Sequence, residues 1–425
     1  MAAVVVVGGG LAGLAAAARL ARQRHEVRLL DAHAPGERQA PADEPASFTL
    51  PAVYRDLFRK TGRPLEPDVR LVPVDPARRY VFPDGRVLDL PTANRAAMLE
   101  AFGRGLGGRA ANEWDAFVTW GGAMWGRLRH RLAPEGETSG SIDPTTFRSR
   151  LRDPANRLVL DWYAIDAGID PASATEHVAV LPYLEQAFGA WRVDGGLGVL
   201  AAATARRARR CGATLEGGTE VMQVLVRDGE VTGVLAADGS TVHADVVVDT
   251  AGVPVRPAPA SPSAPAGPAT VTLHVLAAEP PDLPVETVLL PRAGGRGIVV
   301  ARPDVAVEPS RVLVRGAVPA ALAAGEEAEL ARRLLDAVNR AGVDLRGEVI
   351  GVSVRPLQPT PRARRWPRRS MPGWLDLRDG LAVPDVDGLL LAVSQVRGGL
   401  AVPWQGLVAA LAASGCGTAP RRRPG

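Results

Sequence analysis

The feature that most constrains this chain is an N-terminal apolar run that ends in a glycine-rich turn. Val4 to Val7 are four consecutive valines, and Gly8-Gly9-Gly10-Leu11-Ala12-Gly13 follows them directly. An alanine-rich segment with helical spacing comes next, and a second, mostly apolar run, Val27 to Leu30, ends in Asp31. Strand, tight turn, helix and strand in this order predict a Rossmann-type α/β unit.

The turn contains the GxGxxG pattern, in which each glycine has its own physical role. Gly8 permits the sharp turn, Gly10 lets the backbone approach a pyrophosphate, and Gly13 lets the helix pack closely on the sheet. The free N–H groups at the start of the helix would face the phosphates. Asp31 lies near the offset at which a carboxylate accepts hydrogen bonds from a ribose. The sequence therefore predicts a dinucleotide site. A glycine-rich turn without a ligand is the alternative.

Composition excludes several classes of function. With 46% hydrophobic and 23% charged residues, the 425-residue chain is typical of a globular protein of two domains or one large interleaved unit. The net charge of +4 is small and the arginines are scattered, so no nucleic-acid partner is expected. Cys211 and Cys416 are too few for a disulfide framework or a zinc cluster, and no metal site is expected.

The N-terminus lacks the basic region of a signal peptide, and no apolar run reaches the ~18 residues that a transmembrane helix needs. We therefore expect a cytoplasmic protein.

The middle of the chain predicts a second unit inserted into the first. Residues 78–91 contain two apolar runs around Asp84-Gly85, a strong hairpin signal. Helical spacing covers Arg95 to Leu132 and Phe147 to Ala167. Three tryptophans in the first helical stretch would form ordinary core or line a cavity, namely Trp114, Trp120 and Trp125.

Strands dominate the later part of the chain. Four β runs between 271 and 318, a helix over Glu326 to Ala341 and a strand from Gly347 predict an α+β substrate domain. The chain closes with an apolar strand, Leu389 to Val393, a glycine-containing loop and a helix from about Pro403. This closing unit would bring a second helix N-terminus to the ligand.

Several stretches together resemble the flavin-dependent phytoene desaturases (carotenoid desaturases), within the amine-oxidase and protoporphyrinogen-oxidase group. The resemblance extends from Val4 to Ser414. It is carried by VVVVGGGLAGLAAAARLA, FTLPAVYRDLF, LVPVDPARRYVFPDG, VLPYLEQAFGAWRVDGGLGVLAAATARRARRCGATLEGGTEV, ADVVVDTAG and VDGLLLAVS. The second and third stretches are not general features of dinucleotide-binding proteins, so this family is preferred to a plain NAD dehydrogenase.

The resemblance implies the α/β fold class, with a glutathione-reductase-like, Rossmann-type FAD/NAD(P)-binding domain and an interleaved α+β substrate domain. The expected boundaries are 1–75, 185–255 and 385–415 for the FAD-binding domain, 76–184 and 270–384 for the substrate domain, 253–269 for a Pro/Ala-rich connector and 416–425 for a basic tail.

The resemblance also implies which residues bind FAD. The glycines of the turn would hold the pyrophosphate, Asp31 the adenosine ribose, and the Val221 backbone the adenine. Arg38 would meet the cofactor, and the closing loop would lie against the flavin end. The full expected set is Gly8, Gly10, Leu11, Ala12, Gly13, Asp31, Ala32, Arg38, Val221, Ser394, Gly398 and Gly399.

Two departures from the family pattern concern the flavin end of the site. Where family members have a longer segment with a pattern like FDTGP, this chain has only ERQAPADEPAS. After the closing strand, where the family has a glycine pair or Gly-Asp, this chain has Ala392-Val393-Ser394-Gln395. The sequence indicates an intact adenine end and an altered flavin end.

The function implied by the resemblance is FAD-dependent oxidation of an apolar, isoprenoid or carotenoid-type substrate. Hydride transfer to the flavin would give desaturation or isomerisation. No catalytic residue can be assigned, because His130, His177 and His274 lie in no recognisable motif. The alternatives are a flavin-poor isoprenoid-binding or partner protein, similar to the Rab GDP-dissociation inhibitors, and an amine-oxidising enzyme.

One basic cluster remains outside these assignments. Five arginines between 362 and 369 surround Trp366. They would hold the protein on an anionic membrane surface, or they form a solvated loop. The oligomeric state stays open.

Overall fold

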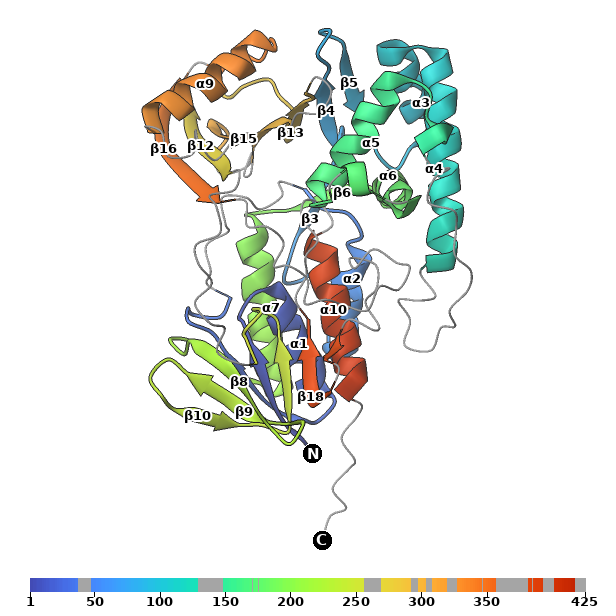
Figure 1. The fold of residues 1–425 in the computed structure, drawn as a ribbon. Helices are drawn as coiled ribbons and strands as arrows, with labels where there is room; N and C mark the ends of the chain where they lie inside the picture. The colour runs from blue at the N-terminus through green and yellow to red at the C-terminus, as the bar shows by residue number, and fades with distance from the viewer. Residues whose placement is uncertain are drawn as a thin grey trace.

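The computed structural model of the chain consists of a lower part and an upper part, each built around its own β-sheet (Figure 1). The structure describes residues 1–36, 47–128, 148–169, 171–174, 176–255, 269–291, 297–302, 308–318, 327–345, 347–356, 381–383, 385–392 and 401–416. The elements given below belong to these residues.

The lower part contains a nine-stranded sheet. Its strands are β1 (Ala3–Val7), β2 (Glu26–Leu30), β7 (Thr214–Glu216), β8 (Val221–Arg227), β9 (Glu230–Ala236), β10 (Thr241–His243), β11 (Val246–Asp249), β17 (Ala382–Val383) and β18 (Val386–Leu391). Strands β18, β11, β1, β2 and β7 are parallel neighbours in that order, whereas β8, β9 and β10 pair antiparallel. This parallel core confirms the predicted α/β fold class.

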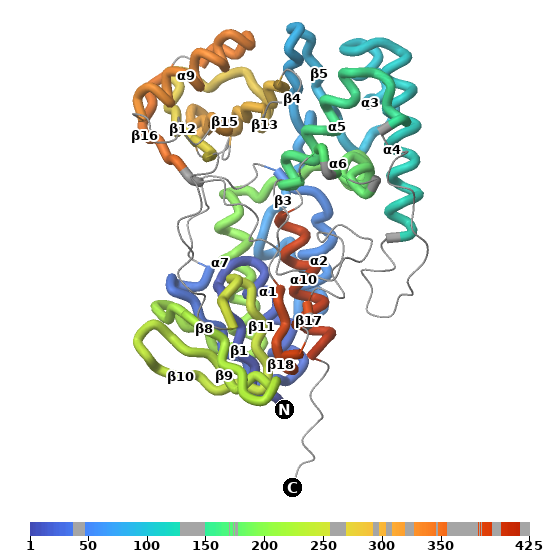
Figure 2. The backbone as a smooth tube through the Cα atoms, in the orientation of Figure 1, coloured from blue at the N-terminus to red at the C-terminus, as the bar shows by residue number. Residues whose placement is uncertain are grey.

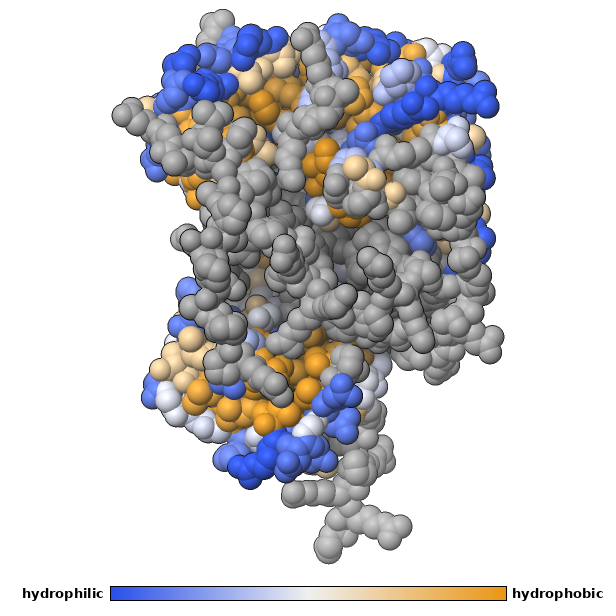
Figure 3. Space-filling view, in the orientation of Figure 1, coloured by the Kyte–Doolittle hydropathy of each residue, from blue (hydrophilic) through white to orange (hydrophobic). Residues whose placement is uncertain are grey.

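The four valines of β1 are buried on both sides of the sheet, as expected for the centre of a parallel sheet. Val4 and Val6 pack in the core that contains α1 (Leu11–Arg22) and α7 (Leu197–Cys211). Val5 and Val7 pack with valines of β8, β9 and β10 on the other face. Figure 3 shows hydrophobic side chains gathered on the lower part of the molecule, over this sheet.

Helices cover the lower sheet and build much of the upper part. The remaining helices are α2 (Ala52–Thr61), α3 (Arg95–Leu106), α4 (Gly108–Leu128), α5 (Pro154–Asp166), α6 (Val180–Phe188), α9 (Glu327–Arg340) and α10 (Ala401–Cys416), with short 3-10 turns η1 (Arg148–Arg150), η2 (Pro171–Ser173) and η3 (Glu176–Ala179). Among these described helices, none is long and apolar enough to span a bilayer.

The upper part contains a seven-stranded sheet in the order β16-β12-β15-β14-β13-β4-β5. Its strands are β4 (Arg78–Val81), β5 (Val87–Leu90), β12 (Ala269–Ala277), β13 (Glu286–Leu289), β14 (Ile298–Ala301), β15 (Arg311–Val318) and β16 (Gly347–Pro356). The antiparallel pair β4–β5 confirms the predicted hairpin. Its strand β4 also pairs in parallel with β13, which joins segments about two hundred residues apart.

A two-stranded ribbon, β3 (Leu71–Val74) and β6 (Ala190–Val193), lies between the two parts (Figure 2). Phe48 extends it, because its backbone N–H and C=O each form a 2.8 Å hydrogen bond with Trp191. The chain enters α7 directly after β6, through Gly195 and Gly196 at positive φ. The ribbon therefore brings the upper part close to the helices of the lower sheet.

Two predicted helices differ from the structure. The stretch from Arg95 is two helices, because Gly107 at φ +96° interrupts it. The helix expected from Phe147 begins only at Pro154, where the Asp153 side chain caps it. The closing helix α10 is described from Ala401, in agreement with the expected start near Pro403. The tryptophans of α4 pack in the core, with Trp114 fully buried and stacked on Phe102.

Candidate functional site

The turn between β1 and α1 is held in a shape that only glycine permits at its start. Gly8 has φ +103°, and a Cβ there would lie 2.5 Å from the hydroxyl oxygen of Thr250. That hydroxyl donates a 2.7 Å hydrogen bond to the carbonyl of Val7. The Gly8 N–H donates to the carbonyl of Leu30 at 2.9 Å, which ties the turn to the end of β2.

The start of α1 has the features of an anion-binding helix N-terminus. Its N-cap is Gly10, which offers no side-chain cap, and its first turn contains no acidic residue. A Cβ on Gly13 would lie 1.9 Å from the carbonyl oxygen of Gly8, whereas a Cβ on Gly10 would meet open space among the described atoms. The helix therefore packs tightly on the strand, and an uncapped helix N-terminus of this kind favours an anion such as a phosphate.

Asp31 closes this turn from the end of β2. Its two carboxylate oxygens accept hydrogen bonds from the backbone N–H groups of Gly9 and His33. Its side chain is only 13% exposed. A carboxylate fixed beside the glycine turn in this way fits the role of ribose acceptor.

The segment before β8 lies against the residues that follow β2. Thr219 donates its N–H to the carbonyl of Asp31 at 2.9 Å. A Cβ on Gly217 would lie 3.0 Å from the Cα of Ala34, so this segment lies directly on the residues that follow β2. Val221, two residues beyond Thr219, begins β8. The structure thus brings the glycine turn, Asp31, Ala32 and the start of β8 to one edge of the sheet.

The remaining predicted cofactor residues lie outside the described residues. These are Arg38, Ser394, Gly398 and Gly399. The basic cluster at 362–369 and the tail beyond Cys416 also lie outside them, as does most of the predicted connector.

Asp249 is a site residue that the sequence reasoning missed. It is fully buried at the end of β11, the strand next to β1, and its carboxylate accepts the N–H groups of Ala251, Gly252 and Val253 at 2.8–2.9 Å. These bonds shape the loop that carries Thr250 against the glycine turn. The sequence feature that could have identified Asp249 is its position directly after the apolar run Val246 to Val248.

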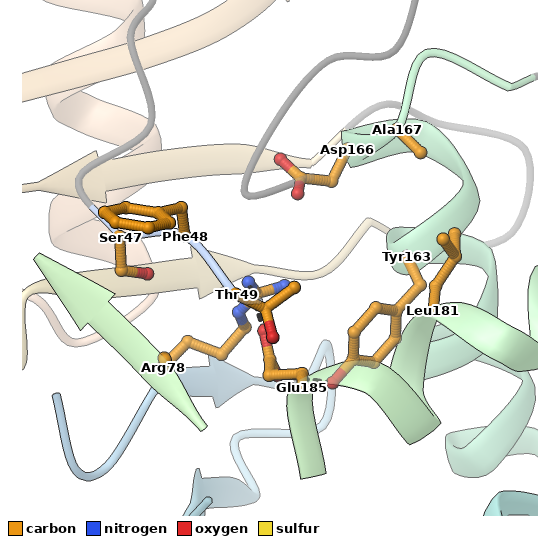
Figure 4. A pocket seen from close by; sticks show the side chains of 10 residues that line it. Ser47, Phe48, Thr49, Arg78, Tyr163, Asp166, Ala167, Leu181 and Glu185 are labelled. Carbon is orange, nitrogen blue, oxygen red and sulfur yellow. Dashed lines mark hydrogen bonds and ion pairs between the residues drawn. The ribbon is translucent and has the colours of Figure 1, made fainter. Parts of the chain in front are cut away.

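A second polar site lies in the upper part, beside the ribbon. A small cavity of about 20 Å³ opens between β4, α5, α6 and β6 (Figure 4). Its walls are apolar at Phe48, Leu181 and Ala190. Its polar lining residues are Ser47, Thr49, Arg78, Tyr163, Asp166 and Glu185.

An ion pair between Arg78 and Glu185 dominates this cavity. Arg78 Nη2 donates to Glu185 Oε2 at 2.8 Å, and the Tyr163 hydroxyl donates to Glu185 Oε1. The Arg78 guanidinium also lies 5.3 Å from the centre of the Tyr163 ring. Both ion-pair side chains are less than a tenth exposed, so water screens this pair little.

The electrostatics of the cluster extend to Glu286 on β13. Glu286 Oε1 lies 3.8 Å from Arg78 Nε. Burial raises the pKa of Glu286 to about 7, and the positive charge of Arg78 opposes this rise. Burial alone would lower the pKa of Arg78, but the neighbouring Glu185 carboxylate holds it well above its usual range. Arg78 is therefore permanently charged, whereas Glu286 titrates near neutral pH.

Neither of the two candidate histidines within the described residues lines the cavity. His177 is buried in η3, and His130 lies outside the described residues. On β12, the Nδ1 atom of His274 lies 3.5 Å from Arg311. Burial, with a smaller contribution from Arg311, lowers the pKa of His274.

Comparisons with known proteins agree with this geometry. The family model described as FAD dependent oxidoreductase matches residues 3–401. A hydroxyneurosporene desaturase of Cereibacter sphaeroides is 32% identical over 274 residues, covering 58% of this chain and 55% of that protein. An all-trans-zeta-carotene desaturase of Myxococcus xanthus is also 32% identical, covering 58% and 51%. The matched regions thus span about half the length of these curated relatives.

A crystal structure of an oxidoreductase from Methanosarcina mazei has the same fold. Its TM-score is 0.64 at 15% sequence identity, and the match covers 97% of this chain and 99% of that one. The expected resemblance to carotenoid desaturases is confirmed by the two curated relatives.

Proposed function

Because the chain belongs to the family of FAD-dependent oxidoreductases, we propose that it oxidises an apolar, isoprenoid or carotenoid-type substrate. The reaction would be a desaturation or an isomerisation. When bound, the flavin supplies the hydride acceptor for this chemistry.

The observation that carries the proposal is the cluster of Gly9, Asp31 and Thr219 at the uncapped start of α1. This cluster fits the adenosine diphosphate half of FAD. The similarity to two carotenoid desaturases supports the substrate class.

This chain's own residues would bind and orient FAD in distinct ways. The N–H groups of residues 10–13 would donate to the pyrophosphate, and Asp31 would accept from the ribose hydroxyls. The backbone at Val221 would meet the adenine. We further propose that Arg38, Ser394, Gly398 and Gly399 contact the remainder of the cofactor.

The domain division remains part of this proposal. Residues 1–75, 185–255 and 385–415 would form the cofactor-binding unit, and 76–184 with 270–384 the substrate unit. The sheet membership of most described strands supports it, since β1, β2, β7–β11 and β18 share one sheet and β4, β5 and β12–β16 share another. Strand β17 differs, because it lies within 270–384 but pairs with β18 in the lower sheet.

The first experiment is the visible absorption spectrum of the purified protein, before and after denaturation, with added FAD as the reference. We expect a flavin spectrum and near-stoichiometric release of FAD. Anaerobic addition of phytoene or zeta-carotene should then bleach the flavin. A colourless protein that takes up no FAD would reject the proposal in favour of a flavin-poor isoprenoid-binding protein.

The arginines around Trp366 support a separate proposal about contact with membranes. We propose that residues 362–369 contact an anionic membrane surface in which the substrate resides. Flotation with liposomes containing phosphatidylserine should show binding that weakens with salt. Equal flotation with neutral liposomes at all salt concentrations would contradict it.

A further inference from the structure

We propose that the cavity at Arg78 binds one neutral oxygen atom, a hydroxyl or a carbonyl, of an otherwise apolar substrate. This inference rests on the proposed function, because it adds a preference, among isoprenoids, for those that carry an oxygen atom. It assigns a role in binding to Arg78, whereas the expected FAD contacts lie elsewhere.

The first observation is an unused hydrogen-bond donor. The Arg78 side chain is 3% exposed and its Nη2 donates to Glu185. Its Nε–H has no hydrogen-bond acceptor among the described residues, since Glu286 Oε1 is 3.8 Å away. A buried donor without an acceptor is unfavourable, so an acceptor atom from outside the chain fits here.

The size of the cavity limits what this acceptor can be. About 20 Å³ is room for one water-sized group. A phosphate or a sugar would not fit. The apolar side chains of Phe48 and Leu181 also line the cavity, which favours an apolar group next to the bound oxygen.

The surrounding charges favour a neutral group. Among the described residues, Glu185 and Glu286 place carboxyl groups beside Arg78. An anion in the cavity would lie against these carboxyl groups, and a cation would meet the Arg78 guanidinium directly. The raised pKa of Glu286 agrees with an environment that disfavours further negative charge.

Thr49 distinguishes a hydroxyl from a carbonyl. Its hydroxyl donates to the carbonyl of Leu184 at 3.1 Å, which leaves its oxygen lone pairs able to accept. A ligand hydroxyl can accept from Arg78 and donate to Thr49, whereas a carbonyl can only accept. We therefore expect the alcohol to bind more tightly than the aldehyde.

A binding series without turnover tests the proposal on the wild-type protein. The probes are geranylgeraniol, geranylgeranial and the hydrocarbon of the same chain length, presented in detergent micelles. Their dissociation constants follow from the quenching of tryptophan fluorescence. We expect the alcohol to bind about tenfold more tightly than the hydrocarbon, with the aldehyde between them. Equal dissociation constants for all three would overturn the proposal and leave a water molecule in the cavity.

A variant separates the donor from the charge. Arg78→Lys keeps a cation opposite Glu185 but removes the Nε–H, so the preference for the alcohol should fall to about twofold or less. The matched control is Arg28→Lys, in the ion pair of Arg28 and Glu216 on the lower sheet, and it should leave the preference unchanged. A full preference in a folded Arg78→Lys protein would also overturn the proposal.

The wild-type series keeps the test decisive even where Arg78→Lys does not fold. It also distinguishes this inference from the proposed function. Flavin bleaching by a pure hydrocarbon, with no preference for oxygen, would leave the function and remove the cavity assignment. A clear preference for the alcohol in binding, without any bleaching of the flavin, would support the cavity assignment and contradict the proposed function.

Discussion

The glycine turn and the Arg78 cluster are both polar sites in an apolar protein, but they are built in opposite ways. The turn uses backbone N–H groups and one carboxylate, mostly from the first 31 residues. The Arg78 cluster uses side chains from β4, α5, α6 and β13, which are far apart in the sequence. Backbone geometry therefore governs the first site, and side-chain charge governs the second.

This contrast predicts that removing one charge from the cluster has the largest effect on folding. Arg78→Met would leave Glu185 buried without its cation, and the unfolding free energy should fall by about 3–5 kcal/mol. Urea denaturation measures this loss. The double variant Arg78→Met/Glu185→Gln should recover much of it. An equal loss in both variants would mean that packing, not charge, holds the cluster together.

The second prediction concerns pH and tests the same cluster through Glu286. Burial raises its pKa from 4.5 to about 7, so the folded state binds a proton more tightly than the unfolded state. This contribution to stability is fully present below pH 4.5 and is lost as pH rises through about 7. It amounts to roughly 3 kcal/mol.

Urea denaturation between pH 5 and 8 measures that pH dependence. The Glu286→Gln variant, which cannot ionise at this position, should lack it. The same decline with pH in wild type and variant would assign the effect to another group.

The third prediction tests the backbone site by adding one carbon atom. A Cβ on Gly13 would lie 1.9 Å from the Gly8 carbonyl oxygen, so Gly13→Ala should destabilise the protein by about 1–3 kcal/mol and release FAD. Gly103→Ala is the control, because a Cβ there meets open space within α3 among the described atoms. It should stabilise by about 0.5–1 kcal/mol. Retained FAD in Gly13→Ala would contradict a tightly packed turn.

The smallest effect is expected at Asp31. Asp31→Asn weakens the acceptor for the ribose and replaces one of the two oxygens that accept the Gly9 and His33 N–H groups by a donor. The affinity for FAD should fall about tenfold, and the unfolding free energy by about 1 kcal/mol. Titration of the FAD-free protein with FAD measures this. Asp238→Asn changes a turn carboxylate that also accepts a backbone N–H, from Ser240, and it should leave the affinity unchanged. An unchanged affinity in Asp31→Asn would remove Asp31 from the site.

Local features of the fold were predictable because their causes lie close together in sequence. The valine run predicts the strand β1, and Asp84-Gly85 predicts the β4–β5 hairpin, as found. The break between α3 and α4 was not predicted, although Gly107 and Gly108 lie at this junction. The break was missed because the helical spacing of apolar residues continues across it, and this spacing does not reveal that Gly107 has a positive φ.

Contacts between residues far apart in the chain could not be predicted from the sequence. Nothing in the hairpin signals that β4 pairs with β13, and nothing around Arg78 distinguishes it from Arg79 beside it. Yet Arg78 is buried on Glu185, whereas Arg79 pairs with Asp89 in a half-exposed position. Which arginine points inward depends on strands that come together only in the folded chain.

The arrangement of Asp31 has a consequence for how a nucleotide is captured. Both of its carboxylate oxygens already accept a backbone N–H, so the side chain keeps one rotamer before any ligand arrives. A ribose diol would then meet a pre-organised acceptor, and little side-chain entropy would be lost on binding. Adenosine diphosphate alone, without the flavin ring, should therefore retain a measurable part of the affinity for this edge of the sheet.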